Sequence, residues 1–340
     1  MARAVEVAVP CRTDLAGGTL DIWPLGLLHP GALTVNAAVP VTVRLVVSDD
    51  VPEGVVIHEP PGDGPRRLGP DAAGRDLTAA VVFALAPRGG YRVRVLDQPP
   101  VGSGLGGSSA YGVALACAVL ELQGTDRTDA RVVALVRDLE ARLLATPTGV
   151  QDHWAALLGG VLAVHLEPGG ERIERMGVDT GWLGERLLVF FTGITHRSGM
   201  VNWEVVRRRL DGDHPTAVRL EAIAAAARAC REALLAGDDR AVAEAIGAEW
   251  EARCELAPEV APPELRAIVE AAGAAGALAV KACGAGGGGS LLVWCPEGAA
   301  GRIGEALERA VPGGRVLGTG VRTEGLSLAS GRGAGSPGAP

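Results

Sequence analysis

Two clusters of glycine constrain this 340-residue chain more than any other feature of its sequence. Residues 102–108 read GSGLGGS, and residues 284–289 read GAGGGG. Glycine lets the backbone adopt left-handed conformations and approach a ligand closely, but each glycine costs backbone entropy on folding. A tight turn or a two-residue hairpin needs fewer glycines than either cluster contains. We therefore interpret both clusters as backbone that passes close to a ligand.

The first cluster lies between an expected strand at residues 91–96 and an expected buried helix at residues 108–122. Inward-facing N–H groups and the start of a helix together form an anion site, usually for phosphate. The pattern G-x-G-x-x-G also spells a dinucleotide fingerprint, but no parallel β/α repeat follows it. A Walker-A loop is excluded because the sole lysine, Lys281, lies outside any such pattern. We expect the phosphate site to consist of Gly102, Ser103, Gly104, Leu105, Gly106, Gly107, Ser108 and Ser109.

Composition excludes several classes of protein. Hydrophobic residues make up 48% and charged residues 21%, which is typical of a folded chain. The net charge of −8 argues against non-specific nucleic-acid binding. No apolar run approaches the roughly 18–20 residues of a membrane span, and the N-terminal apolar stretch is too short for a signal peptide. The six cysteines are widely spaced, which predicts reduced thiols and a cytoplasmic location.

The pattern along the chain predicts an α+β fold in two lobes joined near residue 175. Alternating residues 5–9 predict a strand that Pro10 ends, and residues 31–48 predict further strand. Helices dominate the second half, where Gly237 is placed as a C-terminal cap of a helix over residues 216–236. We expect domains at residues 1–175 and 176–328, followed by a disordered tail at residues 329–340.

Three segments in this order resemble the signature motifs of the GHMP kinases, the superfamily of galactokinase, homoserine kinase, mevalonate kinase and phosphomevalonate kinase. They read RTDLAGGTLD at residues 12–21, PPVGSGLGGSSA at residues 99–110 and KACGAGGGG at residues 281–289. GVQD at residues 149–152 and FTGITHRS at residues 191–198 are most similar to the D-glycero-D-manno-heptose 7-phosphate kinase branch. Thr19 and Leu20 depart from that branch, which leaves the acceptor open.

The resemblance implies an N-terminal lobe of the ribosomal protein S5 type, a C-terminal α/β-sandwich lobe and an active site between them. It implies that Asp152 is the general base, and that Arg12 neutralises the transferred phosphoryl group and orients Asp152. Ser108 and Glu140 are implied ligands of Mg²⁺, which accompanies ATP as phosphate donor. The implied acceptor-binding residues are Gly17, Gly18, Asp21, Arg197, Gly286, Gly287 and Gly288.

Simpler interpretations stay open at several of these positions. Glu140 could be an ordinary helix acid and Arg197 a surface residue, while Lys281 is expected to pair with a nearby acid. A mevalonate-kinase alignment would place Gln151 at the position of the base, but glutamine cannot accept a proton there, so we choose Asp152. Four further side chains could bind ligand but are expected to be structural: Trp23, Trp154, His153 and His196.

These observations predict a small-molecule kinase that acts on a sugar hydroxyl, with the anomeric hydroxyl of a heptose or heptose 7-phosphate as the expected acceptor. One alternative is a kinase for another sugar, such as fucose, galactose or a uronic acid. Another is a catalytically silent protein of the same fold that senses sugar and ATP. We expect a monomer or homodimer that binds ATP and a sugar, without nucleic-acid or membrane partners.

Overall fold

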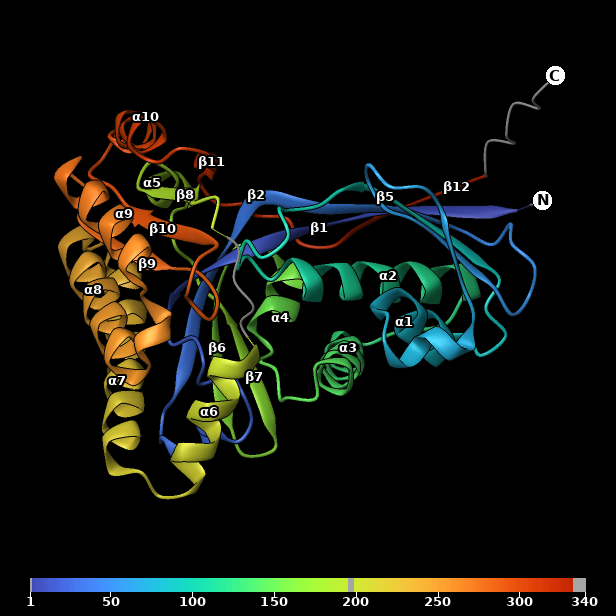
Figure 1. The fold of residues 1–340 in the computed structure, drawn as a ribbon, viewed down its shortest axis with the longest axis horizontal. Helices are drawn as coiled ribbons and strands as arrows, with labels where there is room; N and C mark the ends of the chain where they lie inside the picture. The colour runs from blue at the N-terminus through green and yellow to red at the C-terminus, as the bar shows by residue number, and fades with distance from the viewer. Residues whose placement is uncertain (1, 195–198, 333–340) are drawn as a thin grey trace.

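The computed structural model describes residues 2–194 and 199–332 of the chain, which fold into two lobes (Figure 1). Among the described residues, the first lobe contains an eight-stranded sheet in which β12, β1, β2, β5, β3 and β4 are neighbours in that order. Strand β6 pairs with the other half of β2, and β7 pairs with β6. The strands are β1 (Arg3–Ala16), β2 (Leu33–Ser48), β3 (Val56–Glu59), β4 (Arg66–Leu68), β5 (Tyr91–Asp97), β6 (Val161–Glu167), β7 (Gly170–Arg175) and β12 (Ser327–Arg332).

Four helices cover one face of this sheet (Figure 1). Helix α2 is buried over most of its surface, as its uniformly small and apolar sequence predicts. Helix α3 begins where the Thr128 hydroxyl accepts a hydrogen bond from the Arg131 N–H. The helices are α1 (Leu77–Leu85), α2 (Gly107–Gln123), α3 (Asp129–Leu144) and α4 (Gln151–Leu158), with short 3₁₀ turns η1 (Leu25–Leu28) and η2 (Pro70–Gly74).

The second lobe packs helices around a four-stranded antiparallel sheet in the order β11, β8, β10, β9. Helices α7 and α8 pack against each other and also against β1, so the two lobes share this strand. The elements are α5 (Thr180–Gly184), β8 (Leu187–Phe191), α6 (Gly199–Leu210), α7 (His214–Ala236), α8 (Asp239–Leu256), η3 (Pro258–Val260), α9 (Pro263–Ala274), β9 (Ala279–Ala282), β10 (Ser290–Trp294), α10 (Ala300–Ala310) and β11 (Arg315–Thr319). None of the helices in the described ranges is long and apolar enough to cross a membrane.

Strand β1 continues past Pro10 to Ala16, so the prediction that Pro10 ends it is wrong. The pairing with β2 shifts between Pro10 and Cys11, and a β-bulge is a position where a strand tolerates proline. Beyond the bulge every residue of β1 is buried, whereas burial alternates before it. The second half of the strand therefore carries Arg12 and Asp14 into the region between the lobes.

The prediction of a disordered tail from residue 329 is wrong for residues 329–332. These residues belong to β12, which pairs antiparallel with the start of β1, so the chain returns to the first lobe at its end. Strand pairing uses backbone hydrogen bonds, which need no apolar side chains, so the composition of this segment did not reveal it. Residues 333–340 lie outside the described residues.

Candidate active site

A cavity of about 1170 Å³ lies where loops of the two lobes meet. It is lined by the segment after β1, the loop before α2, the start of α4, and the loop between β9 and β10. Three sequence motifs that are more than 75 residues apart along the chain therefore surround one space. The predicted site residues that line it are Arg12, Asp21, Gly102, Ser103, Gly104, Gly106, Gly107, Ser108, Ser109, Glu140, Asp152, Gly286 and Gly288.

Other predicted residues lie behind this lining. Leu105 is buried in the core of the first lobe, and its carbonyl oxygen accepts a hydrogen bond from the Arg12 N–H. Gly17 and Gly18 leave no space for a side chain, because a Cβ would collide with the Leu33 carbonyl or with the Asp14 carboxylate. Gly287 donates its N–H to the Val260 carbonyl at 2.8 Å. Arg197 lies outside the described residues.

The predicted phosphate loop, residues 102–109, follows β5 and includes the first three residues of α2. Gly102, Gly104 and Gly106 have φ of 74°, 73° and 72°, a region that other residues rarely adopt. A Cβ on Gly104 would lie 2.6 Å from the Cys283 carbonyl oxygen, and one on Gly106 would lie 2.8 Å from Asp152 Cγ. Glycine is therefore required both for the turn and for contact with the neighbouring segments.

Arg12 connects the phosphate loop to Asp152. Its Nε donates to Asp152 Oδ1 at 2.6 Å, and its Nη1 donates to the Gly104 carbonyl at 2.8 Å. Arg12 is almost fully buried, whereas the Asp152 side chain keeps 24% of its surface exposed. The structure thus holds the Asp152 carboxylate in a fixed direction beside the phosphate loop and leaves part of it open to the cavity.

Asp21 faces the N-terminal end of α4. The helix begins at Gln151, the residue directly before Asp152. Asp21 Oδ2 accepts hydrogen bonds from the N–H groups of Val150 and Gln151 at 2.8 and 3.0 Å, and so caps the helix from a distant segment. Gly149 has no room for a side chain because a Cβ would collide with this carboxylate. Burial raises the pKa of Asp21 to about 6, and the nearby Asp152 charge adds to the rise, while the two N–H donors oppose it.

Glu140 projects from α3 toward the start of α2. Ser108 Oγ donates to its Oε1 at 2.7 Å and Ser109 Oγ donates to its Oε2 at 2.8 Å, while His153 Nε2 lies 3.0 Å from Oε2. Burial alone would raise the pKa of Glu140, but the contacts with His153 and the two serines outweigh it and lower the pKa below its ordinary value. Glu140 is therefore a buried, ionised carboxylate and not an exposed helix acid.

The third-motif loop, residues 284–289, is attached to its surroundings mainly through backbone. Ser290 N–H donates to the Ser103 carbonyl at 2.8 Å, and Thr192 Oγ1 donates to the Gly289 carbonyl at 2.7 Å. A Cβ on Gly289 would lie 2.7 Å from the Gly102 carbonyl oxygen. The two glycine clusters therefore touch each other directly, which only residues without side chains permit.

Family models match both halves of the chain. The GHMP kinases N terminal domain matches residues 75–160, and the GHMP kinases C terminal domain matches residues 230–313. The chain belongs to the GHMP kinase family. Members of this family are phosphotransferases that use ATP as phosphate donor and an alcohol group as acceptor, and this enzyme has the same two-lobed fold.

Individual relatives of this GHMP kinase include both sugar kinases and mevalonate kinases. A D-glycero-alpha-D-manno-heptose 7-phosphate kinase from Campylobacter jejuni is 28% identical over 85% of this chain and 89% of its own length. A bifunctional fucokinase/GDP-fucose pyrophosphorylase from Arabidopsis thaliana is 26% identical over 75% of this chain, which spans about a quarter (26%) of that longer protein.

Solved structures share the fold at lower identity. A sugar kinase structure from Campylobacter jejuni superimposes with a TM-score of 0.73 at 21% identity and covers 96% of this chain and 98% of that one. Galactokinase from Lactococcus lactis in complex with galactose superimposes with a TM-score of 0.75 at 14% identity, with 95% of each chain covered. These similarities establish the architecture of this GHMP kinase.

Lys281 belongs to a buried quartet of charges, defined as Asp14, Glu249, Arg253 and Lys281. Lys281 Nζ lies 3.2 Å from Asp14 Oδ2 and 2.8 Å from Glu249 Oε2, which confirms the expected pairing with an acid. Arg253 Nη1 lies 3.1 Å from Asp14 Oδ2, and its Nη2 donates to the Gly284 carbonyl at 2.6 Å. Burial alone would raise the pKa of Asp14, but the charges of Lys281 and Arg253 lower it. The quartet connects β1, α8 and the third-motif loop of this GHMP kinase.

Sequence reasoning missed two cavity residues on α6, Asn202 and Trp203. Trp203 is 48% exposed and lines the cavity, whereas Trp23 is 70% exposed outside the lining and Trp154 is packed in the core. Thr19 also lines the cavity and adopts φ of +80°, an unusual conformation for a β-branched residue. The aromatic side chain of Trp203 was the one sequence feature that could have suggested a ligand contact, but nothing in the sequence placed it beside the motifs.

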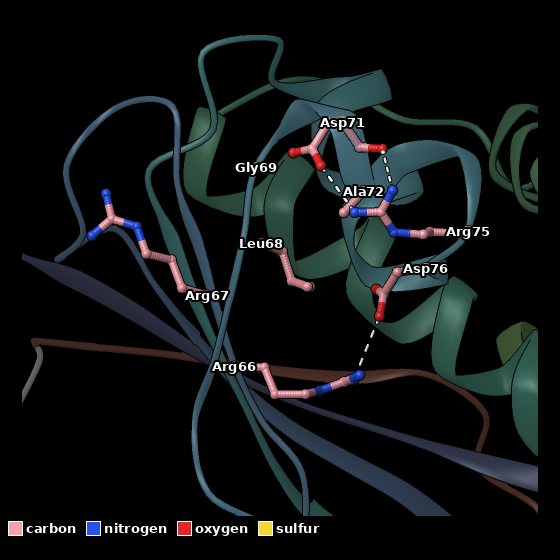
Figure 2. A pocket seen from close by; sticks show the side chains of 8 residues that line it. All are labelled: Arg66, Arg67, Leu68, Gly69, Asp71, Ala72, Arg75 and Asp76. Carbon is pink, nitrogen blue, oxygen red and sulfur yellow. Dashed lines mark hydrogen bonds and ion pairs between the residues drawn. The ribbon is translucent and has the colours of Figure 1, made fainter.

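A second cavity, of about 240 Å³, adjoins the first and shares Arg66 and Asp76 with it. Figure 2 shows that its arginines do not converge on one point, since Arg67 points away from the others. Arg75 bonds to Asp71 at 2.9 Å and Arg66 lies 3.4 Å from Asp76. This cavity is therefore a gap between paired surface charges, and the predicted site residues line the larger one.

Proposed function

We propose that this chain is an ATP-dependent sugar kinase that phosphorylates the anomeric hydroxyl of a heptose or a heptose 7-phosphate. The observation that carries the proposal is the Arg12–Asp152 pair beside the phosphate loop. In this pair a buried guanidinium fixes a partly exposed carboxylate next to the loop that we propose for the nucleotide phosphates. The resemblance of residues 149–152 and the heptose kinase among the relatives support the choice of sugar.

The reaction needs a proton acceptor and charge neutralisation at the transferred group. The sugar hydroxyl gives its proton to Asp152 as its oxygen bonds to the γ-phosphorus, and the bond from that phosphorus to the bridging oxygen breaks to release ADP. Arg12 neutralises charge on the transferred phosphoryl group and keeps Asp152 oriented. Backbone N–H groups of the phosphate loop hold the β- and γ-phosphates.

The residues present fit a magnesium ion. Ser108 Oγ and Glu140 Oε1 are oxygen donors 2.7 Å apart, and both residues line the cavity. The described residues contain no cluster of three or more His, Cys, Asp or Glu side chains that could hold a metal alone. Kinases bind Mg²⁺ through one or two protein oxygens together with substrate phosphates, so this donor set suffices. The ion supplies further neutralisation of phosphate charge when it is bound.

The acceptor end of the cavity supports a sugar. Asp21 and Asn202 offer polar groups to hydroxyls, and Trp203 offers an aromatic face to the C–H side of a sugar ring. Among the described residues that line the cavity, the arginines are Arg12, Arg66 and Arg253. Each of them already has a carboxylate partner, which for Arg66 is Asp76 at 3.4 Å, so we propose Arg197 as the partner of an acceptor phosphate.

The test is ADP release with Mg-ATP across heptose 7-phosphate, unphosphorylated heptose, fucose, galactose and glucuronate, followed by NMR of the product to locate the new phosphate. Turnover on heptose 7-phosphate at the anomeric carbon, with KM raised about tenfold or more by Arg197→Met, supports the full proposal. Turnover restricted to an unphosphorylated sugar refutes the phosphorylated acceptor and removes the role of Arg197. ATP binding without turnover on any sugar favours the sensor alternative.

A further inference from the structure

Two neighbouring residues at the start of α4 face different parts of the site. Asp152 points to Arg12 and is partly open to the cavity. His153, the next residue, is completely buried, and its Nε2 lies 3.0 Å from Glu140 Oε2. The short helix that carries the proposed base therefore also contacts the proposed metal ligand.

The two oxygens of Glu140 have different surroundings. Oε1 accepts the Ser108 hydroxyl, which is the other proposed metal ligand. Oε2 accepts the Ser109 hydroxyl at 2.8 Å and has the imidazole of His153 beside it. A glutamate side chain has three rotatable bonds, so contacts to one oxygen decide where the other one points. The arrangement keeps Oε2 in the protein and leaves Oε1 with Ser108.

The burial of His153 is costly if its role is only to fill space. Its Nδ1 has no hydrogen-bond partner among the described residues, and its Nε2 contacts Glu140 Oε2 at ion-pair distance without the alignment of a regular hydrogen bond. A buried polar atom without a hydrogen bond costs about 1–3 kcal/mol. An apolar side chain of similar size would avoid that cost. The contact between Nε2 and Glu140 is the feature of His153 that an apolar side chain cannot reproduce.

We propose that His153 is a positioning residue that fixes the Glu140 carboxylate so that Oε1 is presented, together with Ser108, to the metal ion of the metal–nucleotide complex. The inference rests on the proposed function, because only a metal–nucleotide substrate gives Glu140 an ion to bind. Groups that orient a metal ligand typically change metal affinity by about 10- to 100-fold when they are removed. His153 also couples the position of the metal ligand to that of Asp152, since both residues lie on the first turn of α4.

The test measures metal binding directly and not turnover. Mn²⁺ is titrated into the full-length enzyme saturated with ADP, and the free Mn²⁺ signal is followed by electron paramagnetic resonance. His153→Phe keeps a ring but removes the donor, and should weaken Mn²⁺ binding about 10- to 100-fold with the affinity for metal-free ADP unchanged. His153→Gln keeps an N–H donor and should stay within about threefold of the wild type.

Glu140→Gln in the same titration distinguishes a failure of the metal assignment from a failure of the positioning role of His153. If Glu140→Gln leaves Mn²⁺ affinity unchanged, the metal assignment in the proposed function is wrong. If Glu140→Gln weakens Mn²⁺ binding and folded His153→Phe does not, the positioning role is overturned while the proposed function stands. If His153→Phe fails to fold, the His153→Gln variant decides the question. A loss of Mn²⁺ affinity in His153→Gln as large as that in Glu140→Gln would contradict a role that depends on an N–H donor at position 153.

Discussion

The proposed donor end and the proposed acceptor end of the cavity are built in different ways. The donor end is mainly one continuous segment, the phosphate loop between β5 and α2, completed by Glu140 on α3. The acceptor end is assembled from four separate segments, which contribute Thr19 and Asp21, Asn202 and Trp203, Arg253, and the third-motif loop. A continuous segment leaves a motif in the sequence, whereas an assembled surface does not.

This difference explains why the chemistry of the enzyme can be determined more readily than its acceptor. Phosphate binding by backbone N–H groups requires glycines at fixed spacing, so it is nearly independent of the acceptor. Recognition of a sugar depends on a few side chains, any of which can change without disturbing the fold. The largest effects are therefore expected where the two ends meet, and smaller effects are expected from changes at one end alone.

The largest effect is expected at Asp152, where the two ends meet. Asp152→Asn removes the proton acceptor but keeps the size of the side chain and an oxygen for Arg12, so kcat should fall by ~10²–10⁴-fold or more. The affinity for ATP should stay within a few-fold, because Asp152 does not belong to the phosphate loop. Single-turnover assays and equilibrium ATP binding measure the two quantities. Full turnover by the variant would show that another group accepts the proton.

The next effect concerns the donor end and compares two glycines with similar backbone conformations. Gly104 (φ +73°) and Gly124 (φ +63°) are both left-handed, but only Gly104 lies against backbone. A Cβ on Gly104 would lie 2.6 Å from the Cys283 carbonyl oxygen, whereas a Cβ on Gly124 would meet nothing within 4 Å. Gly124→Ala should cost about 1 kcal/mol of unfolding free energy, and Gly104→Ala about 2–4 kcal/mol. Urea denaturation measures both.

The same pair of variants separates stability from binding. Gly104→Ala should also raise the KM for ATP, because it shifts the phosphate loop, whereas Gly124→Ala at the C-terminal end of α2 should leave the KM unchanged. Equal losses of stability in the two variants would mean that the contact between the two glycine clusters is loose. That result would weaken the view of the donor end as a rigid unit.

Sequence alone predicted the local structure around the proposed donor end more fully than the packing around the proposed acceptor end, for physical reasons. Glycine spacing between a strand and a buried helix predicted the position of the phosphate loop and of α2. The packing of α6 against the cavity was not visible, since Trp203 lies on a helix whose neighbours in space are far away in the chain. Pairing of β12 with β1 was missed because it depends on backbone hydrogen bonds at an edge.

A smaller effect is expected at the acceptor end, where two tryptophans provide a matched comparison. Trp203→Ala removes an aromatic face from the cavity lining, which should raise the KM for the sugar about 3- to 10-fold with the KM for ATP unchanged. Trp23 is 70% exposed and does not line the cavity, so Trp23→Ala should change neither the KM for the sugar nor the KM for ATP. Steady-state kinetics with each substrate varied in turn measures these values. An equal effect of both substitutions would remove Trp203 from the acceptor site.

The smallest expected effect is at Asp21, where function and stability should move in opposite directions. Burial raises the pKa of Asp21 from 3.8 to about 6 in the folded enzyme, so the folded state binds a proton more tightly than the unfolded chain. The contribution of Asp21 to stability is therefore most favourable below about pH 4 and is lost as the pH rises to about 6. Above that pH the buried charge costs at most about 3 kcal/mol.

Asp21→Asn removes this charge and keeps an oxygen for the N–H groups of Val150 and Gln151, although a neutral acceptor bonds them more weakly, by about 1–2 kcal/mol. The net effect should be a stabilisation of about 1 kcal/mol near pH 8 that shrinks to nothing or reverses near pH 4. Urea denaturation of the wild type and of Asp21→Asn between about pH 4 and pH 8 measures the difference in unfolding free energy. The titration of all other groups cancels in this difference. The same variant should bind the sugar more weakly, because a carboxylate accepts stronger hydrogen bonds from hydroxyls than an amide does. The opposite result would be a variant whose stability relative to the wild type is lower near about pH 8 than near about pH 4. The main role of Asp21 would then be to cap α4. The proposed acceptor end would in that case be organised for stability, as the proposed donor end is.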